Sequence, residues 1–231
     1  MKRLRKHIFT VTLKIVQSNT HALMAGLLIA WAVILRIWLV QMGWPQMDSD
    51  EATMGLMALH IWHKQDFPVF FYGQGYMGAL EAYLGAALFS FFGPTLFALR
   101  LGLILLFALF LLGMYLLVSM LYTRNWALFT LFLLSLGSAP VLTRQLVAVG
   151  GIPEMLMFAT GLLVLTLWLT RTYSRERLLR GWRLLAYALW GLLAGLGIWS
   201  HMLILPLVGI AGLLLLLFCL RELLWGERSR C

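Results

Sequence analysis

The sequence predicts an all-α membrane protein, a bundle of about six transmembrane helices with two juxtamembrane helices in the first extracytoplasmic loop. The first reason is composition, since 62% of the 231 residues are hydrophobic and only 12% are charged. Soluble domains are about 45–50% apolar and about 25% charged. The other two reasons are a series of apolar runs of span length and an uneven distribution of charge between them. This composition excludes a soluble enzyme, a nucleic-acid-binding protein and a disordered chain.

Apolar runs occur throughout the chain, and a spanning helix needs about 20 mainly apolar residues. The runs cover roughly 22–41, 76–93, 101–121, 126–142, 155–170, 184–200 and 204–224. Basic residues precede the first run, which is long and lacks a small-residue cleavage site. The first run is therefore predicted to be an uncleaved anchor, preceded by a basic cytoplasmic N-terminus over 1–21.

The basic residues indicate which runs cross the membrane. Segment 171–183 contains Arg171, Arg175, Arg177, Arg180 and Arg183. It would lie outside if all seven runs crossed, against the rule that short basic loops stay cytoplasmic.

If run 76–93, which contains Glu81 and two internal glycines, lies in the interface instead, segment 171–183 becomes cytoplasmic. The tail over 225–231, with Arg228 and Arg230, is then cytoplasmic too, as is Arg221. The transmembrane module spans 22–224, with extracytoplasmic loops at 42–93 and 143–154. The predicted location is the plasma (inner) membrane, multi-pass, with the active face extracytoplasmic.

Most of the acidic residues fall in these two predicted extracytoplasmic loops. They are Asp48, Asp50, Glu51, Asp66, Glu81 and Glu154. Asp48, followed three residues later by Glu51, fits a helix cap for a helical stretch over 51–63. Asp50 and Glu51 form an adjacent pair beside the bilayer, where unpaired charge is costly and usually functional. Capping and function both remain open for these acids.

The stretch after the first acids is apolar and aromatic. Helix 51–63 is apolar almost all round, which is typical of a helix lying on the membrane surface. An aromatic and glycine-rich string follows at 70–76, with Tyr72, Gln74 and Tyr76. This string fits either an interfacial aromatic belt or the lining of a substrate site.

Other polar residues lie near the same predicted face. Arg144 and Glu154 flank a Gly-Gly turn, where Glu154 either caps the next helix or faces the first-loop acids. Arg36 lies in the outer half of the first span, and Arg100 lies at the head of the next span on the same side, where it could snorkel or bind an anion. His201 is more often a polar hairpin residue than a ligand. The two cysteines, at 219 and 231, give neither a disulfide framework nor a zinc spacing.

Several motifs follow one another along the chain in an order that resembles a known protein family. The Asp50-Glu51 pair opens a juxtamembrane helix, an aromatic and glycine-rich stretch follows, and Phe91-Phe92-Gly93-Pro94 then precedes Phe97-Ala98-x-Arg100-Leu101. This order resembles the membrane glycosyltransferases of the C superfamily (GT-C), especially bacterial relatives of protein O-mannosyltransferases and aminoarabinose transferases. The resemblance covers roughly residues 22–170.

The resemblance implies transfer of a sugar from a polyprenyl-phosphate donor to an acceptor on the extracytoplasmic face, with inversion. It implies that Asp50 is the catalytic base. Glu51 and Glu154, together with Asp48, would hold a divalent cation, Mg²⁺ or Mn²⁺, or orient the donor phosphate. Residues that would bind the donor phosphate or the acceptor are Arg100, Arg144, Tyr72, Gln74 and Tyr76.

Family members are longer, so the resemblance implies that this chain corresponds to their N-terminal half and that a second chain could complete the site. The expected partners are the bilayer and the lipid-linked donor, without nucleic acid. One alternative is a truncated or non-catalytic GT-C-like membrane partner. Another is a transporter or lipid-handling protein, but transporters place charges and helix breaks near the midplane, and no such pattern is visible in the sequence.

Overall fold

The computed structural model describes residues 2–171 and 180–226, and all of its regular elements are helical. Among these described residues, the β-structure is limited to two isolated bridges, which pair Phe70 with Gly78 and Met77 with His201. Arg175, Arg177, Arg228 and Arg230, which support the predicted topology, lie outside the described residues, as does Cys231. The predicted all-α membrane bundle is confirmed.

The described helices are long where the sequence is apolar. They are α1 (Lys2–Gln41), α2 (Ser49–Trp62), α3 (Leu80–Phe92), α4 (Leu96–Leu121), α5 (Arg124–Leu136), α6 (Ala139–Leu146), α7 (Ile152–Arg171), α8 (Arg180–Ser200), the 3₁₀ turn η1 (Met202–Ile204) and α9 (Leu205–Gly226). Within the described residues, five segments are long and apolar enough to span a membrane: Asn19–Gln41, Leu96–Leu121, Ile152–Arg171, Gly181–Ser200 and Met202–Arg221. The chain is therefore a multi-pass membrane protein.

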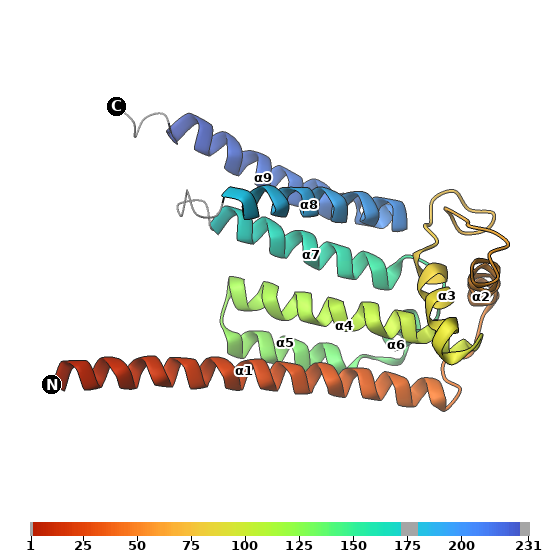
Figure 1. Cartoon of the computed structure of the whole chain (residues 1–231), viewed down its shortest axis with the longest axis horizontal. Coiled ribbons are helices and arrows are strands. Elements are labelled where there is room, and N and C mark those ends of the chain that lie inside the picture. Colours follow the sequence, from red (N-terminus) through yellow and green to blue (C-terminus); the bar gives the residue numbers. More distant parts are fainter. Residues whose placement is uncertain (1, 172–179, 227–231) are drawn as a thin grey trace.

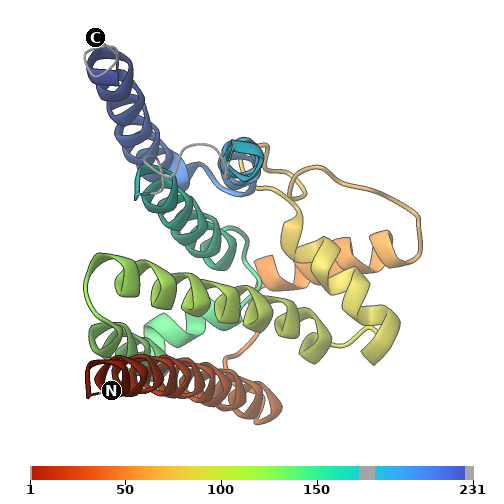
Figure 2. The ribbon, with the colours of Figure 1, turned by 60° about the vertical axis from the view of Figure 1, so that its left-hand side comes forward.

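The long helices lie roughly side by side, and the start of α1 and the end of α9 lie at the same end of the bundle (Figure 1). Helix α4 packs against α1, α5 and α7, and α7 in turn packs against α8 and α9. Helices α2, α3 and α6 lie at the opposite end, which we call the α2–α3 end (Figures 1 and 2).

The predicted span 126–142 is not one straight helix. It is broken into α5 and α6, which are bent by 84° relative to each other. Gly137 ends α5 with a φ of 67°, a conformation that glycine adopts without steric cost. A proline then stands in the first turn of α6, where its missing N–H costs no hydrogen bond. The predicted loop 143–154 shrinks accordingly to 147–151, because α6 runs to Leu146 and α7 begins at Ile152.

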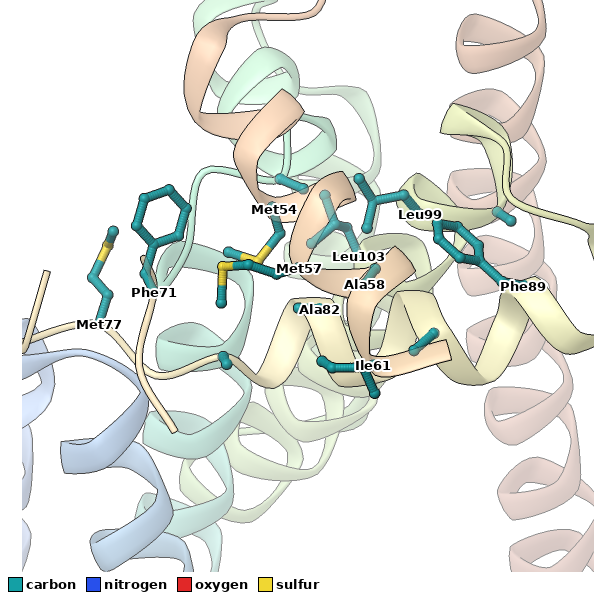
Figure 3. Close-up of a cluster of buried hydrophobic side chains, with 14 residues drawn as sticks. Met54, Met57, Ala58, Ile61, Phe71, Met77, Ala82, Phe89, Leu99 and Leu103 are labelled. Atoms are coloured by element: carbon teal, nitrogen blue, oxygen red, sulfur yellow. The ribbon is translucent and has the colours of Figure 1, made fainter. Parts of the chain in front are cut away.

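The segment between the first two spans folds into two short helices, as the sequence predicts. Helix α3 has only 13 residues, which is short for crossing a bilayer. Methionine, alanine and leucine side chains of α2, α3 and α4 form one buried cluster there (Figure 3). Helices α3 and α4 are in close contact at Gly85, where a Cβ atom would lie 2.6 Å from Leu99 Cδ1. This packing fixes α2 across the end of the bundle.

Candidate functional site

Asp48 and Asp50 stand at the start of α2 and are both exposed. Asp48 is the N-cap residue, and its Oδ1 accepts a hydrogen bond of 2.9 Å from the backbone N–H of Glu51. The capping interpretation of Asp48 is therefore confirmed. Asp50 lies in the first turn of α2, and none of the described residues donates a hydrogen bond to its carboxylate. Asp50 thus presents an unpaired carboxylate on the first turn of α2.

Glu51 points into the protein and forms an ion pair with Arg100 of α4. Arg100 Nη2 lies 2.6 Å from Glu51 Oε2, and Arg100 Nε lies 2.9 Å from Glu51 Oε1. The backbone N–H of Ala148 donates a further hydrogen bond of 3.1 Å to Glu51 Oε1. Both side chains are fully buried. The two-point geometry is the one in which a guanidinium binds a carboxylate most strongly.

The Glu51–Arg100 pair bears on two of the predicted roles. Both oxygens of Glu51 are taken by N–H donors, so this carboxylate does not fit a metal centre in the described arrangement. Arg100 is engaged by Glu51 and covered by protein, so it does not face a donor phosphate. Among the residues that the structure describes, no group of three or more His, Cys, Asp or Glu side chains could hold a metal ion.

Arg36 of α1 is also fully buried and neither snorkels nor faces solvent. Its Nη2 donates to Gln145 Oε1 at 2.7 Å, and its Nη1 donates to the carbonyl oxygens of Ala32 and Ser135. Its guanidinium carbon lies 3.8 Å from the centre of the Phe107 ring. Arg36 therefore binds a carbonyl left free at the end of α5, where the broken span bends.

Glu81 of α3 and Glu154 of α7 lie next to each other in the interior, from helices far apart in sequence. Glu81 Oε2 accepts a hydrogen bond of 3.1 Å from the backbone N–H of Gly150. Burial and the neighbouring Glu154 carboxylate raise the pKa of Glu81 well above its ordinary value. Glu154 thus does face a first-loop acid, but that acid is Glu81, to which the sequence assigned no role.

Hydrogen bonds of Tyr72 hold the aromatic string after α2 in place. Tyr72 donates to Asp66 Oδ2 at 2.7 Å, and its hydroxyl lies 2.9 Å from His60 Nδ1 of α2. Burial and the Asp66 carboxylate raise the pKa of Tyr72 to about 12, so the phenol stays protonated. Tyr76 is exposed and meets the His201 ring edge to face. Tyr72 thus holds the linker to α2.

The remaining predicted residues lie apart from the buried acids. Arg144 is exposed in the last turn of α6. Gln74 is half-buried, and its side-chain oxygen has no hydrogen-bond donor among the described residues. A cavity of about 350 Å³ lies between α2 and the start of α4, lined mainly by apolar residues, and Glu51 is its one acidic residue. The structure therefore places Glu51 with Arg100, places Glu154 with Glu81, and leaves Asp50 and Arg144 exposed.

Comparison with protein-family models, with curated proteins and with solved structures found no match.

Proposed function

We propose that this protein is a membrane glycosyltransferase that transfers a sugar from a polyprenyl-phosphate donor to an acceptor hydroxyl on the extracytoplasmic face, with inversion. The observation that carries the proposal is Asp50. It is an exposed, unpaired carboxylate on the first turn of α2, and the next residue is fixed to the core by a buried ion pair.

The chemistry requires a base beside the acceptor. Asp50 takes the proton from the acceptor hydroxyl while the acceptor oxygen forms a bond to the anomeric carbon. The bond between that carbon and the donor phosphate oxygen breaks, and the lipid phosphate leaves with the electron pair. Attack opposite to the leaving group inverts the configuration, as it does in inverting glycosidases.

Two features of the α2–α3 end support this assignment. The Glu51 bonds to Arg100 and to the backbone of Ala148 hold α2 in place, and a base contributes only when it is fixed within reach of its proton. Arg144 is the second feature, because it is an exposed cation in the last turn of α6 that can bind a lipid phosphate. No step in this proposal passes through a metal ion.

The test is sugar transfer in proteoliposomes that contain labelled polyprenyl-phosphate sugars and membrane acceptors. Asp50→Asn is expected to lower the transfer rate by about 10²–10⁴-fold, the usual contribution of a general base. Asp48→Asn is the matched control, because it removes the same charge two residues away and asparagine caps a helix as well as aspartate does. Equal transfer by wild type and Asp50→Asn would refute the role of Asp50.

The broken pair α5 and α6 favours a second candidate, a transporter or lipid-handling protein, since transporters place broken helices at their binding sites. The break in this chain is filled by Arg36, which is bonded to protein oxygens. We therefore place the enzyme first. Uptake of a lipid or ion into proteoliposomes without sugar transfer would reverse that order.

A further inference from the structure

The adjacent acids Glu81 and Glu154 are the most unusual buried groups outside the proposed catalytic site. Glu81 is 2% exposed and Glu154 is fully buried. Among the described residues, Glu81 Oε1 and both oxygens of Glu154 have no hydrogen-bond donor. The fully buried Ser200 hydroxyl and the backbone N–H groups of Gly151 and Glu154 lie beside the Glu154 carboxylate, although none of them makes a hydrogen bond of normal geometry with it. Buried polar atoms without partners are rare and call for an explanation.

The charges around the pair do not neutralise it. Glu51 of α2 faces Glu81 but is already paired with Arg100 of α4. The loop between α6 and α7 contributes the Gly150 N–H, which is a donor but not a cation. His201, which directly precedes η1, packs its ring against Gly151. Because the only ion pair between described residues is that of Glu51 and Arg100, no arginine or lysine compensates a double negative charge.

Two carboxylates in contact in a dry interior cannot both be charged, because each destabilises the charge of the other. A single proton removes this conflict. A protonated carboxyl group donates an O–H hydrogen bond to the second carboxylate, so that Glu81 Oε1 and one oxygen of Glu154 become partners of each other. The raised pKa of Glu81 has the same cause, burial beside Glu154.

We propose that Glu81 and Glu154 share one proton and thereby form a pH-sensitive latch that holds the first turn of α3 beside the first turn of α7. Loss of the proton to a base in the solvent leaves two adjacent negative charges and no O–H donor, and the two helices then repel each other at this point. The proposal is independent of the proposed transferase activity, since it concerns the protonation and packing of the α2–α3 end.

The direction of the pH effect follows from linkage. The pKa of Glu81 is higher in the folded protein than in the unfolded chain. The folded state therefore binds more protons, so the stability contributed by the pair is fully present below the unfolded pKa. That stability is lost as the pH rises through the folded pKa. Each unit by which the two pKa values differ corresponds to a tenfold change in the unfolding equilibrium constant.

The test is thermal unfolding of the full chain in detergent, followed by tryptophan fluorescence between pH 5 and 9. In wild type we expect the melting temperature to fall by at least about 3 °C as the pH rises. In Glu81→Gln the fall should be absent, because the amide donates a hydrogen bond to Glu154 at every pH. Glu51→Gln is the matched control, since it should lower the melting temperature at every pH and keep the slope. His201→Asn checks that the slope does not come from the histidine.

An infrared spectrum gives an independent readout. Wild type should show the C=O band of a protonated carboxyl group at pH 7, and Glu81→Gln should lose this band while Glu51→Gln retains it. The latch is refuted if Glu81→Gln keeps the wild-type pH slope or if the band is unchanged in it. It is also refuted if Mg²⁺ or Ca²⁺ raises the melting temperature of wild type but not of Glu81→Gln, because a cation would then neutralise the pair. Failure of the Asp50→Asn test would leave these outcomes unaffected.

Discussion

Replacing Arg100 by methionine should destabilise the protein strongly, because it leaves Glu51 as a buried charge. The substitution removes the donors at 2.6 Å and 2.9 Å and leaves the carboxylate with only the Ala148 N–H at 3.1 Å. Removing one partner of a buried ion pair costs about 3–5 kcal/mol. A domain is stable by only about 5–15 kcal/mol, so Arg100→Met should lose a large share of its folded population on mild heating.

A second substitution should recover much of this loss. Combining Arg100→Met with Glu51→Leu removes both charges and leaves the Ala148 N–H as the main unpaired group, which costs about 1–3 kcal/mol. Glu51→Leu alone should be as harmful as Arg100→Met, because it leaves a buried guanidinium unpaired. The double variant is therefore expected to be more stable than either single variant.

The assay is reversible unfolding of the four proteins in mixed detergent micelles, compared as a double-mutant cycle. Arg144→Met is the control, because this arginine is exposed and its loss should change the free energy of unfolding by no more than about 0.5 kcal/mol. If the effects of Arg100→Met and Glu51→Leu simply add in the double variant, the two side chains are not coupled and the reasoning fails.

Three other changes test the α2–α3 end. Gly151→Ala should cost about 2 kcal/mol or more in unfolding free energy, since φ is 91° there and the new Cβ would collide with the His201 ring. Tyr72→Phe should cost about 1–2 kcal/mol and speed proteolysis between α2 and α3, because its hydroxyl bonds are lost. In a chain without native cysteines, Tyr76→Cys should react with an impermeant thiol reagent in intact cells, and Tyr122→Cys only after permeabilisation; the reverse pattern would invert the predicted topology.

The sequence was sufficient for the order of the spanning and interfacial helices, because that order depends on local composition. The short α3 could be recognised from charge balance and from Glu81 within its run, and the Asp48 cap from residue spacing. The break at Gly137 was missed. Glycine is common in transmembrane helices, and only tertiary packing shows that this one has a positive φ.

Contacts between side chains could not be predicted where the two residues lie far apart in the sequence. Glu51 and Arg100 are 49 residues apart, so the sequence suggested separate roles for them rather than an ion pair. Glu81 and Glu154 meet only because the fold brings the first turn of α3 beside the first turn of α7. A carboxylate in a sequence carries no information on which distant group neutralises it, and so the free acid Asp50 and the buried acid Glu51 look equivalent.

Three buried ionisable side chains bond to the same short segment, which indicates where this protein is most rigid. Arg36, Glu51 and Glu81 come from α1, α2 and α3, and each bonds to the segment 145–150. Three helices are thus fastened to one short stretch that runs from the last residues of α6 into the loop before α7. A loop held by buried charges opens only when a charge loses its partner, so its local opening should cost nearly as much as global unfolding.

Hydrogen exchange tests this rigidity directly. The amides of Ala148 and Gly150 should exchange as slowly as those in the middle of α4, although both residues lie outside regular helix. The amide of Gly75, in the exposed linker between α2 and α3, is the comparison and should exchange quickly. Fast exchange at Ala148 in wild type would show that the Glu51 carboxylate does not hold the loop. Slow exchange that becomes fast in Arg100→Met would show that the guanidinium keeps Glu51 in place, and that the buried pair fixes the loop as well as the helix that carries Asp50.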